Sequence, residues 1–294
     1  MSDFILSTSS TVDLTAEYLE KRDIKYICFT FAMDGEEYLN DFGKSMPISE
    51  FYKRMDNGSE PTTSQVNVSR YIDYFEELVK EGKPILHIDF SSGMSGSYNS
   101  SLIAKQEVME KHPDAQINII DSLGGATGQG LLISLAADRR DEGLSIEEVA
   151  EFVENTKHKI HHWFFASDLK SFIRGGRIST ASGWVGTILK ICPLLRLDDQ
   201  GRIAPTEKCR GKSKAIQALV DKMVEFADDG CDYDNKCFVS HSACIEDAKA
   251  VIELVESKFP KLKDKIEIFD IGPVIGSHTG PGAVGLFFVG ENRK

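Results

Sequence analysis

Residues 84–97, PILHIDFSSGMSGS, carry the clearest signal of the fold class. The first half of this segment, residues 84–90, is a short apolar run typical of a buried strand. Its second half, residues 91–97, is rich in Ser and Gly and opens a helix that we expect to continue to about Lys111. A second apolar run follows at residues 117–121. This order of strand, helix and strand predicts a parallel unit.

The same alternation extends over the first half of the chain. The remaining strands expected there are residues 4–6 and 24–31. The remaining helices expected there are residues 47–55, 67–80, 124–140 and 145–157. Asp13 is expected to cap a helix, and Gly35 to mark a turn. This half is therefore predicted to be α/β, with a mostly parallel sheet flanked by helices.

The second half of the chain has a different pattern. Strands are expected at residues 163–166, 188–197, 201–208, 237–240, 267–271 and 283–289. Helices are expected at residues 212–227 and 246–258, and a Gly-rich loop before the last strand. We therefore predict a domain of residues 1–165 and a second, α+β domain of residues 166–294. Interfaces between such domains often hold ligands.

Bulk composition excludes several classes of protein. The chain has 294 residues and a net charge of −12, which argues against a general nucleic-acid or membrane-surface binder. No apolar stretch is long enough to span a membrane, and the first residues lack the positive region of a signal peptide. The six cysteines form no C-x-x-C pair, so we expect free thiols, a cytoplasmic location and no metal site.

Two hydroxyl-rich segments are candidates for binding an anion. PTTSQ at residues 61–65 is either a helix cap with a turn, or a helix N-terminus whose N–H groups and hydroxyls face an anion. The second segment, residues 91–97, lies where a parallel strand ends, which is where open α/β sheets bind ligands. We expect both segments at the same edge of one sheet. Ser95 almost matches the nucleophile pattern G-x-S-x-G, but Ser97 replaces the final Gly, which weakens a hydrolase interpretation.

Two further segments carry charge or a titratable ring. Arg174, Arg177 and Arg210 form a basic group in an acidic chain, and either face solvent or contact a phosphate or an acidic partner. His278 lies among glycines, where it is either structural or positioned to bond a carboxylate or transfer a proton. The G-x-G-x-x-G at residues 280–285 is followed by a strand and is not a dinucleotide site. His161 and His162 are expected to face solvent or to cap a strand edge.

Taken in order, these segments resemble the DegV family of bacterial fatty-acid-binding proteins. The resemblance runs from about residue 4 to residue 290 and is carried by residues 61–65, 91–98, 168–178, 199–201 with Lys208 and Arg210, and 278–285. It implies a two-domain fold with a ligand tunnel between the domains and a fatty acid in the tunnel. It also implies that Thr63 and Ser95 bind the carboxylate, with Thr62, Ser64, Gly96 and His278 nearby. The family usually has an Asp-Ser pair after its first strand, where this chain has Ser9 and Ser10.

The resemblance further implies a carrier that is not itself an enzyme. Such a protein presents its fatty acid to a separate fatty acid kinase of the dihydroxyacetone-kinase type, and the acyl phosphate enters phospholipid synthesis. Arg174, Arg177 and Arg210 would contact that kinase or its phosphate, and no cofactor is needed. Two alternatives remain open at this stage. One is an acyl hydrolase or transferase with Ser95 as nucleophile and His278 as base. The other is a regulatory protein that senses lipid.

Overall fold

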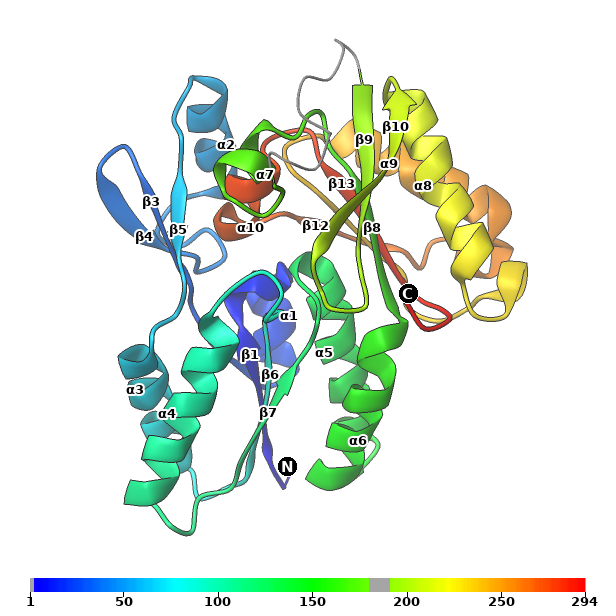
Figure 1. The fold of residues 1–294 in the computed structure, drawn as a ribbon. Coiled ribbons are helices and arrows are strands. Elements are labelled where there is room, and N and C mark those ends of the chain that lie inside the picture. The colour runs from blue at the N-terminus through cyan, green and yellow to red at the C-terminus, as the bar shows by residue number, and fades with distance from the viewer. Residues whose placement is uncertain (1–2, 180–190, 294) are drawn as a thin grey trace.

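A computed structural model describes residues 3–179 and 191–293 of the chain. The strands of these residues form three sheets (Figure 1). The first has four strands in the order β2-β1-β6-β7, the second has six in the order β10-β9-β8-β13-β11-β12, and the third has three in the order β4-β3-β5. The chain therefore combines a parallel α/β unit with a second sheet unit.

The four-stranded sheet is entirely parallel. Its strands are β1 (Ile5–Ser9), β2 (Ile24–Ile27), β6 (Ile85–Asp89) and β7 (Ile117–Asp121). Its helices are α1 (Ala16–Lys21), α3 (Val68–Val79), α4 (Ser97–Lys111), α5 (Ala126–Asp141) and α6 (Ile146–Thr156). Every residue of β1 and β6 is buried, because helices cover both faces. The predicted α/β fold with a helix-flanked parallel sheet is confirmed.

Alternate residues of the strands pack into two different cores. Ile85 points to α3 and α4, where it joins Phe75, whereas Leu86 points to α5 and α6, where it joins Leu132. Figure 1 shows the first helix pair on the left of this sheet and the second on its right. The capping box predicted for α6 is present between Ser145 and Glu148. The cap predicted at Asp13 is wrong, because Thr15 caps α1.

Residues 24–31 were predicted as one strand, but the structure divides them. β2 ends at Ile27, and β3 (Thr30–Met33) belongs to the three-stranded sheet with β4 (Glu36–Leu39) and β5 (Thr62–Ser64). The amide of Phe29 bonds to Ser10 Oγ (3.0 Å) instead of continuing the parallel ladder. An apolar run gives no signal of such a break. The turn expected at Gly35 does join β3 and β4, and α2 (Ile48–Asp56) follows Pro47 as predicted.

The six-stranded sheet is mainly antiparallel. Its strands are β8 (Ile160–Phe165), β9 (Ile191–Leu197), β10 (Ile203–Arg210), β11 (Phe238–His241), β12 (Glu267–Asp270) and β13 (Val284–Val289). Its helices are α7 (Lys170–Arg174), α8 (Lys212–Phe226), α9 (Ile245–Lys258) and α10 (Pro273–Thr279). Short 3₁₀ turns are η1 (Ser10–Val12), η2 (Lys157–Lys159), η4 (Gly230–Asp232) and η5 (Pro260–Leu262). The predicted strand at 188–197 begins outside the described residues.

The segment before β13 was predicted as a Gly-rich loop, but it contains helix α10. Pro273 occupies the first turn, where its missing N–H costs nothing. Gly276 lies inside this helix, packed against α2. A larger residue would not fit there, because its Cβ would come within 2.5 Å of the Tyr52 hydroxyl oxygen. Close packing against α2 therefore explains the glycine, which sequence patterns treat as a helix breaker.

The β9–β10 hairpin connects the two sheet units. Its turn reaches the carboxyl end of the parallel sheet (Figure 1), where the carbonyl of Gly201 accepts a hydrogen bond from Ser91 Oγ (2.9 Å). Arg293 Nη2 also donates across the interface to the carbonyl of Leu123 (3.0 Å). β8 belongs to the six-stranded sheet, and the proposed division of the chain near residue 165 stays a prediction.

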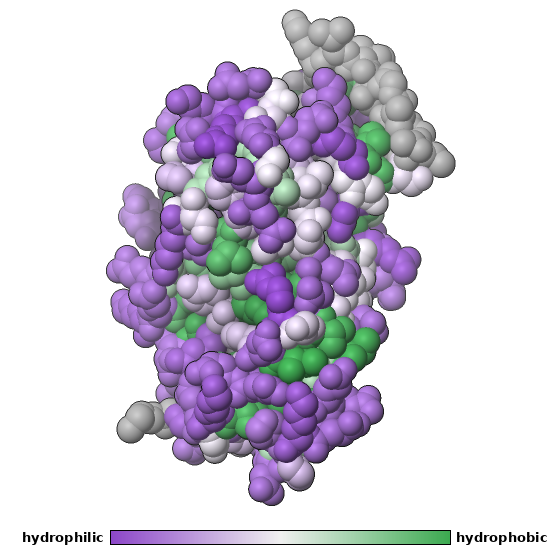
Figure 2. Space-filling view, turned by 90° about the vertical axis from the view of Figure 1, so that its left-hand side faces the viewer, coloured by the Kyte–Doolittle hydropathy of each residue, from purple (hydrophilic) through white to green (hydrophobic). Residues whose placement is uncertain are grey.

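The face viewed in Figure 2 is largely hydrophilic, with one contiguous hydrophobic patch in its lower half and smaller ones elsewhere. The large apolar side chains exposed in the described first half of the chain are Leu39, Leu102 and Ile103. No helix among the described residues is long and apolar enough to cross a membrane.

Candidate functional site

Two adjoining cavities lie between the parallel sheet and the six-stranded sheet. A water-sized molecule can occupy about 60 Å³ of the first and about 70 Å³ of the second. They share the side chains of Met94, Phe172 and Ile203, together with Ile275 and Thr279. Polar groups line the first cavity, which we call the head cavity: Thr63, Ser64, Gln65, Ser95, Arg177 and His278. The second, which we call the tail cavity, is lined mainly by apolar side chains such as Phe164, Leu197 and Phe287.

Thr63 and His278 face each other in the head cavity. Thr63 lies in the middle of β5, and its Oγ1 is 2.8 Å from Nε2 of His278 on α10. Thr63 is half-buried, whereas Thr62 and Ser64 are exposed, as the alternation of a strand requires. The expected helix N-terminus at residues 61–65 is therefore wrong: β5 pairs with β3, and α3 begins later, capped by Asn67. Thr suits a strand because its branched side chain packs well there.

The environment of His278 keeps its ring neutral. Burial, followed by the charges of Arg177 and Arg174, lowers the pKa of His278 to about 4. Its Nδ1 has no hydrogen-bond partner among the described residues and packs on Gly175, where a Cβ would come within 2.1 Å of that nitrogen. If Nε2 carries the proton, it donates to Thr63 Oγ1, and the Thr63 hydroxyl hydrogen is free to donate into the cavity. This arrangement suits a carboxylate.

Ser95 lies in the loop that connects β6 to α4. Its Oγ is 2.9 Å from Ser97 Oγ and accepts a hydrogen bond from the amide of Ser97 (3.2 Å). Ser97 Oγ in turn accepts from the amide of Val66 (3.1 Å), just after β5. A Cβ at Gly96 would lie 2.3 Å from Oε1 at the end of the Gln65 side chain, so glycine leaves room for this side chain against the loop. The two hydroxyl-rich segments belong to different sheets, not to one sheet edge as expected, but the structure brings them together.

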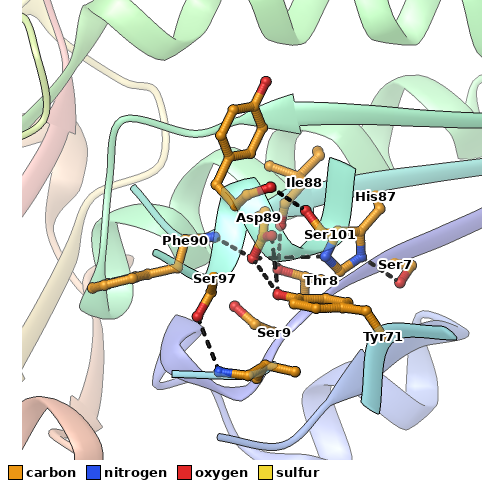
Figure 3. Close-up of polar contacts among 12 residues, drawn as sticks. Ser7, Thr8, Ser9, Tyr71, His87, Ile88, Asp89, Phe90, Ser97 and Ser101 are labelled. Atoms are coloured by element: carbon orange, nitrogen blue, oxygen red, sulfur yellow. Dashed lines mark hydrogen bonds and ion pairs between the residues drawn. The ribbon is translucent and has the colours of Figure 1, made fainter. Parts of the chain in front are cut away.

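A buried network of hydrogen bonds surrounds the end of β6, from which this loop starts (Figure 3). Both carboxylate oxygens of Asp89, the last residue of β6, accept from the hydroxyl of Tyr71 (2.9 Å each), and Oδ1 also accepts from the amide of Phe90 (2.8 Å). His87 Nδ1 is 2.8 Å from Ser7 Oγ on β1. The network fixes the end of β6, from which the Ser95 loop starts. Asp89 was not among the residues predicted for the site, although a carboxylate at the end of an apolar strand is a visible signal.

His161 and His162 are buried, which corrects the expectation that they face solvent or cap an edge. Burial lowers the pKa of His161 to about 4 and holds the pKa of His162 well below its usual range. His161 stacks between Phe226 and Phe288, and His162 lines the tail cavity. Their aromatic neighbours come from elements distant in sequence, so only the folded chain shows that these rings are enclosed.

The three arginines of the basic group occupy different places. Arg177 lines the head cavity and donates through Nε to the carbonyl of Met94 (3.2 Å) and through Nη1 to that of Gly175 (2.6 Å). Arg174 pairs with Glu60 (2.9 Å). Arg210 is exposed at the end of β10 and lies outside the described lining of both cavities. The described residues contain no group of three or more side chains able to hold a metal ion.

Comparison with known proteins agrees with this architecture. The sequence model of a family described as "uncharacterised protein, DegV family" matches residues 4–291. The chain belongs to the DegV family. This DegV chain is 38% identical to a DegV domain-containing protein of Clostridium perfringens, over 100% of both chains.

Solved structures resemble this DegV chain over almost its full length. DegV of Bacillus subtilis, described as a fatty acid binding protein, is 28% identical with a TM-score of 0.84, covering 99% of this chain and 100% of that one. A stearic acid-binding protein of Eubacterium ventriosum is also 28% identical with a TM-score of 0.84, covering 98% of each chain. Members of this family with the same fold therefore bind fatty acids.

Proposed function

We propose that this DegV protein binds a long-chain fatty acid between its two sheet units. The carboxylate lies in the head cavity, within reach of Thr63 and Ser95, and the acyl chain occupies the tail cavity. One observation carries the proposal: two adjoining cavities, one lined by hydroxyls and a neutral histidine and the other mainly by apolar side chains, match the two ends of a fatty acid. Ser64 lines the head cavity beside Thr63, Thr62 is exposed on the other face of β5, and Gly96 lies next to Gln65 in the Ser95 loop.

The energetics favour such a division of roles. Each CH₂ group removed from water contributes about 0.8 kcal/mol, so burying a chain of about fifteen carbons contributes on the order of 10 kcal/mol before the cost of ordering. A buried carboxylate needs hydrogen bonds to stay ionised. Thr63 and Ser95 supply neutral donors, and Arg177, which lines the same cavity, supplies a positive charge. The tail cavity thus sets most of the affinity, and the head cavity sets the orientation.

The protein then presents the bound acid to a separate fatty acid kinase of the dihydroxyacetone-kinase type, whose product is an acyl phosphate for phospholipid synthesis. Arg174, about one-third exposed beside Glu60, and the exposed Arg210 are the basic side chains available to such a partner. The test is to mix the loaded protein with ATP and a purified kinase of this type, and to trap acyl phosphate with hydroxylamine. If no such kinase of the source organism yields acyl hydroxamate, presentation of the acid to a kinase is contradicted, and a lipid sensor becomes the better-supported function.

The geometry gives less support to an acyl hydrolase. His278 Nε2 bonds to Thr63, while Ser95 Oγ bonds to Ser97. The described residues provide no carboxylate hydrogen-bonded to His278 Nδ1, the position that orients the base in a catalytic triad. Labelling of Ser95 by a fluorophosphonate would favour the hydrolase.

The binding proposal predicts that Thr63→Val weakens fatty acid binding by roughly 10- to 100-fold, because a hydrogen bond to a charged group contributes about 1.5–3 kcal/mol. Valine keeps the shape and the strand preference of threonine. The dissociation constant for palmitate or oleate would be measured by titration calorimetry on delipidated protein. Ser95→Ala should act in the same direction.

Thr62→Val is the matched control, because Thr62 is exposed on the other face of β5. Equal losses in both variants would show that the hydroxyl of Thr63 has no special role. Mass spectrometry of the purified protein should also detect bound fatty acid. If no lipid co-purifies and added palmitate or oleate leaves the melting temperature unchanged, the proposed function is wrong.

A further inference from the structure

Cys192 and Cys209 lie directly opposite each other in the β9–β10 hairpin. A bulge between Pro205 and Glu207 shifts the register by one residue, and this shift places Cys209, rather than Lys208, opposite Cys192. Opposite residues of antiparallel strands have Cα atoms about 4.5–5.5 Å apart, which falls within the range found in disulfides. Their side chains share one face of the hairpin.

Both cysteines are free thiols on the side of the hairpin that α8 covers. Each is 7% exposed, and both belong to the large core that includes Ala215 and Leu219 of α8. Burial raises the pKa of both thiols, so at neutral pH they are protonated in the closed hairpin. β10 is an edge strand that pairs with β9 alone among the described strands. Opening of this edge exposes both thiols at once.

A crosslink between Cys192 and Cys209 would act on a hairpin that borders the candidate site. The turn at the far end of the hairpin contacts the Ser95 loop, since Ser91 Oγ donates to the carbonyl of Gly201 (2.9 Å). Between the turn and the cysteines, Leu197 and Ile203 line the tail cavity. The two strands of the hairpin thus form part of the wall of the tail cavity, and the cysteines lie at the end of the hairpin away from its turn. A covalent bond there would limit how far β9 and β10 can separate.

We propose that Cys192 and Cys209 form an oxidation site at which a small disulfide compound closes a cross-strand disulfide across the β9–β10 hairpin. In the first step, the thiolate Sγ of one cysteine attacks a sulfur of the small disulfide, and one small thiol leaves with the bonding electron pair and gains a proton. In the second step, the other cysteine loses its proton and attacks the mixed disulfide, releasing the second small thiol. The two cysteines are oxidised and the small disulfide is reduced.

The test uses the reduced, full-length protein and oxidised glutathione in excess. Of the six thiols, the exposed Cys231 should form a mixed disulfide with glutathione, and two more should be lost without added mass. Peptide mass spectrometry after alkylation should identify these two as one Cys192–Cys209 crosslink. The melting temperature should rise by roughly 3–8 °C and return to its starting value with dithiothreitol, because the crosslink restricts the unfolded chain. This outcome does not depend on lipid binding, so it is separable from the proposed function.

Two variants and one condition make the test decisive. Cys192→Ser and Cys209→Ser should each abolish the crosslink and the temperature shift, whereas Cys231→Ser, which changes an exposed cysteine, should change neither. Separate glutathionylation of the two cysteines without a crosslink would overturn the proposal. So would a crosslink that forms only in urea, or complete resistance of both thiols to oxidation.

Discussion

At the scale of single residues, the head cavity depends on one neutral imidazole. His278 bonds through Nε2 to Thr63, while its other nitrogen is enclosed against Gly175. A protonated ring would need partners for two N–H groups in a space that provides one, and it would face Arg177 and Arg174. In the neutral ring with its proton on Nε2, that N–H donates to Thr63 Oγ1, and the Thr63 hydroxyl can donate to a carboxylate.

The lowered pKa of His278 predicts a pH-dependent contribution to stability. The unfolded chain takes up the proton near pH 6.5 and the folded chain near pH 4, so this contribution is fully present above about pH 6.5 and is lost as the pH falls towards 4. Between pH 7 and pH 4, the free energy of unfolding should fall by about 1–3 kcal/mol more in the native protein than in His278→Asn. Urea titrations at several pH values would measure this; parallel pH profiles would contradict it.

At the scale of elements, β6 and the loop after it form the base of the site. β6 ends in Asp89, whose carboxylate is completely buried and takes its hydrogen bonds from Tyr71 on α3 and from the amide of Phe90. These bonds join a strand, a helix and the start of the Ser95 loop. The position of the loop therefore depends on a helix that contributes no side chain to the described lining of either cavity.

Removal of one hydroxyl should test this arrangement. Tyr71→Phe leaves a buried carboxylate without its phenolic donor and should lower the free energy of unfolding by about 1–3 kcal/mol. Tyr74→Phe is the matched control on the same helix, because the Tyr74 hydroxyl contacts a neutral group, Ser7 Oγ (2.7 Å), and its loss should cost about 0.5–1.5 kcal/mol. Urea denaturation gives both values. A larger effect at Tyr74 would refute the assigned role of Asp89.

At the scale of the whole molecule, the cavities exist because the β9–β10 hairpin reaches across to the parallel sheet. The contact is close: a Cβ at Gly93 would lie 2.5 Å from the carbonyl oxygen of Gln200 and 2.8 Å from that of Gly201. No side chain larger than hydrogen fits between the Ser95 loop and the hairpin turn without displacing backbone. The two sheet units thus depend on this contact for their relative position.

Gly93→Ala should therefore disturb the interface without straining its own backbone, because the φ of Gly93 lies outside the left-handed region. We expect a loss of about 1–3 kcal/mol in the free energy of unfolding, together with weaker fatty acid binding as the wall of the tail cavity shifts. Ser92→Ala, which trims an exposed side chain beside it, should leave both properties unchanged. Thermal unfolding and calorimetric titration of both variants would decide; unchanged binding in Gly93→Ala would mean that the hairpin does not set the cavity.

Local patterns predicted much of this architecture. The parallel strands and their helices follow from alternating apolar runs and caps, such as the capping box at Ser145, because these signals act within a few residues. Local patterns failed where distant contacts decided the structure. Residues 24–31 divide where Ser10 bonds the amide of Phe29, and α10 contains Gly276 at the point where it packs closely on Tyr52. The burial of His162 likewise depends on strands and helices from other parts of the chain.

Local sequence patterns were enough to predict the fold class and the chemical groups of the head cavity, since Thr63, Ser95 and His278 stand in segments of unusual local composition. The folded chain brings these groups together: Thr63 on a short strand, Ser95 on a loop and His278 on a helix line one cavity, and a 2.8 Å contact joins Thr63 to His278 across more than 200 residues of chain. The tail cavity was also decided at this level. Apolar side chains carry no local mark of whether they face a core or a cavity, because that depends on what packs opposite them.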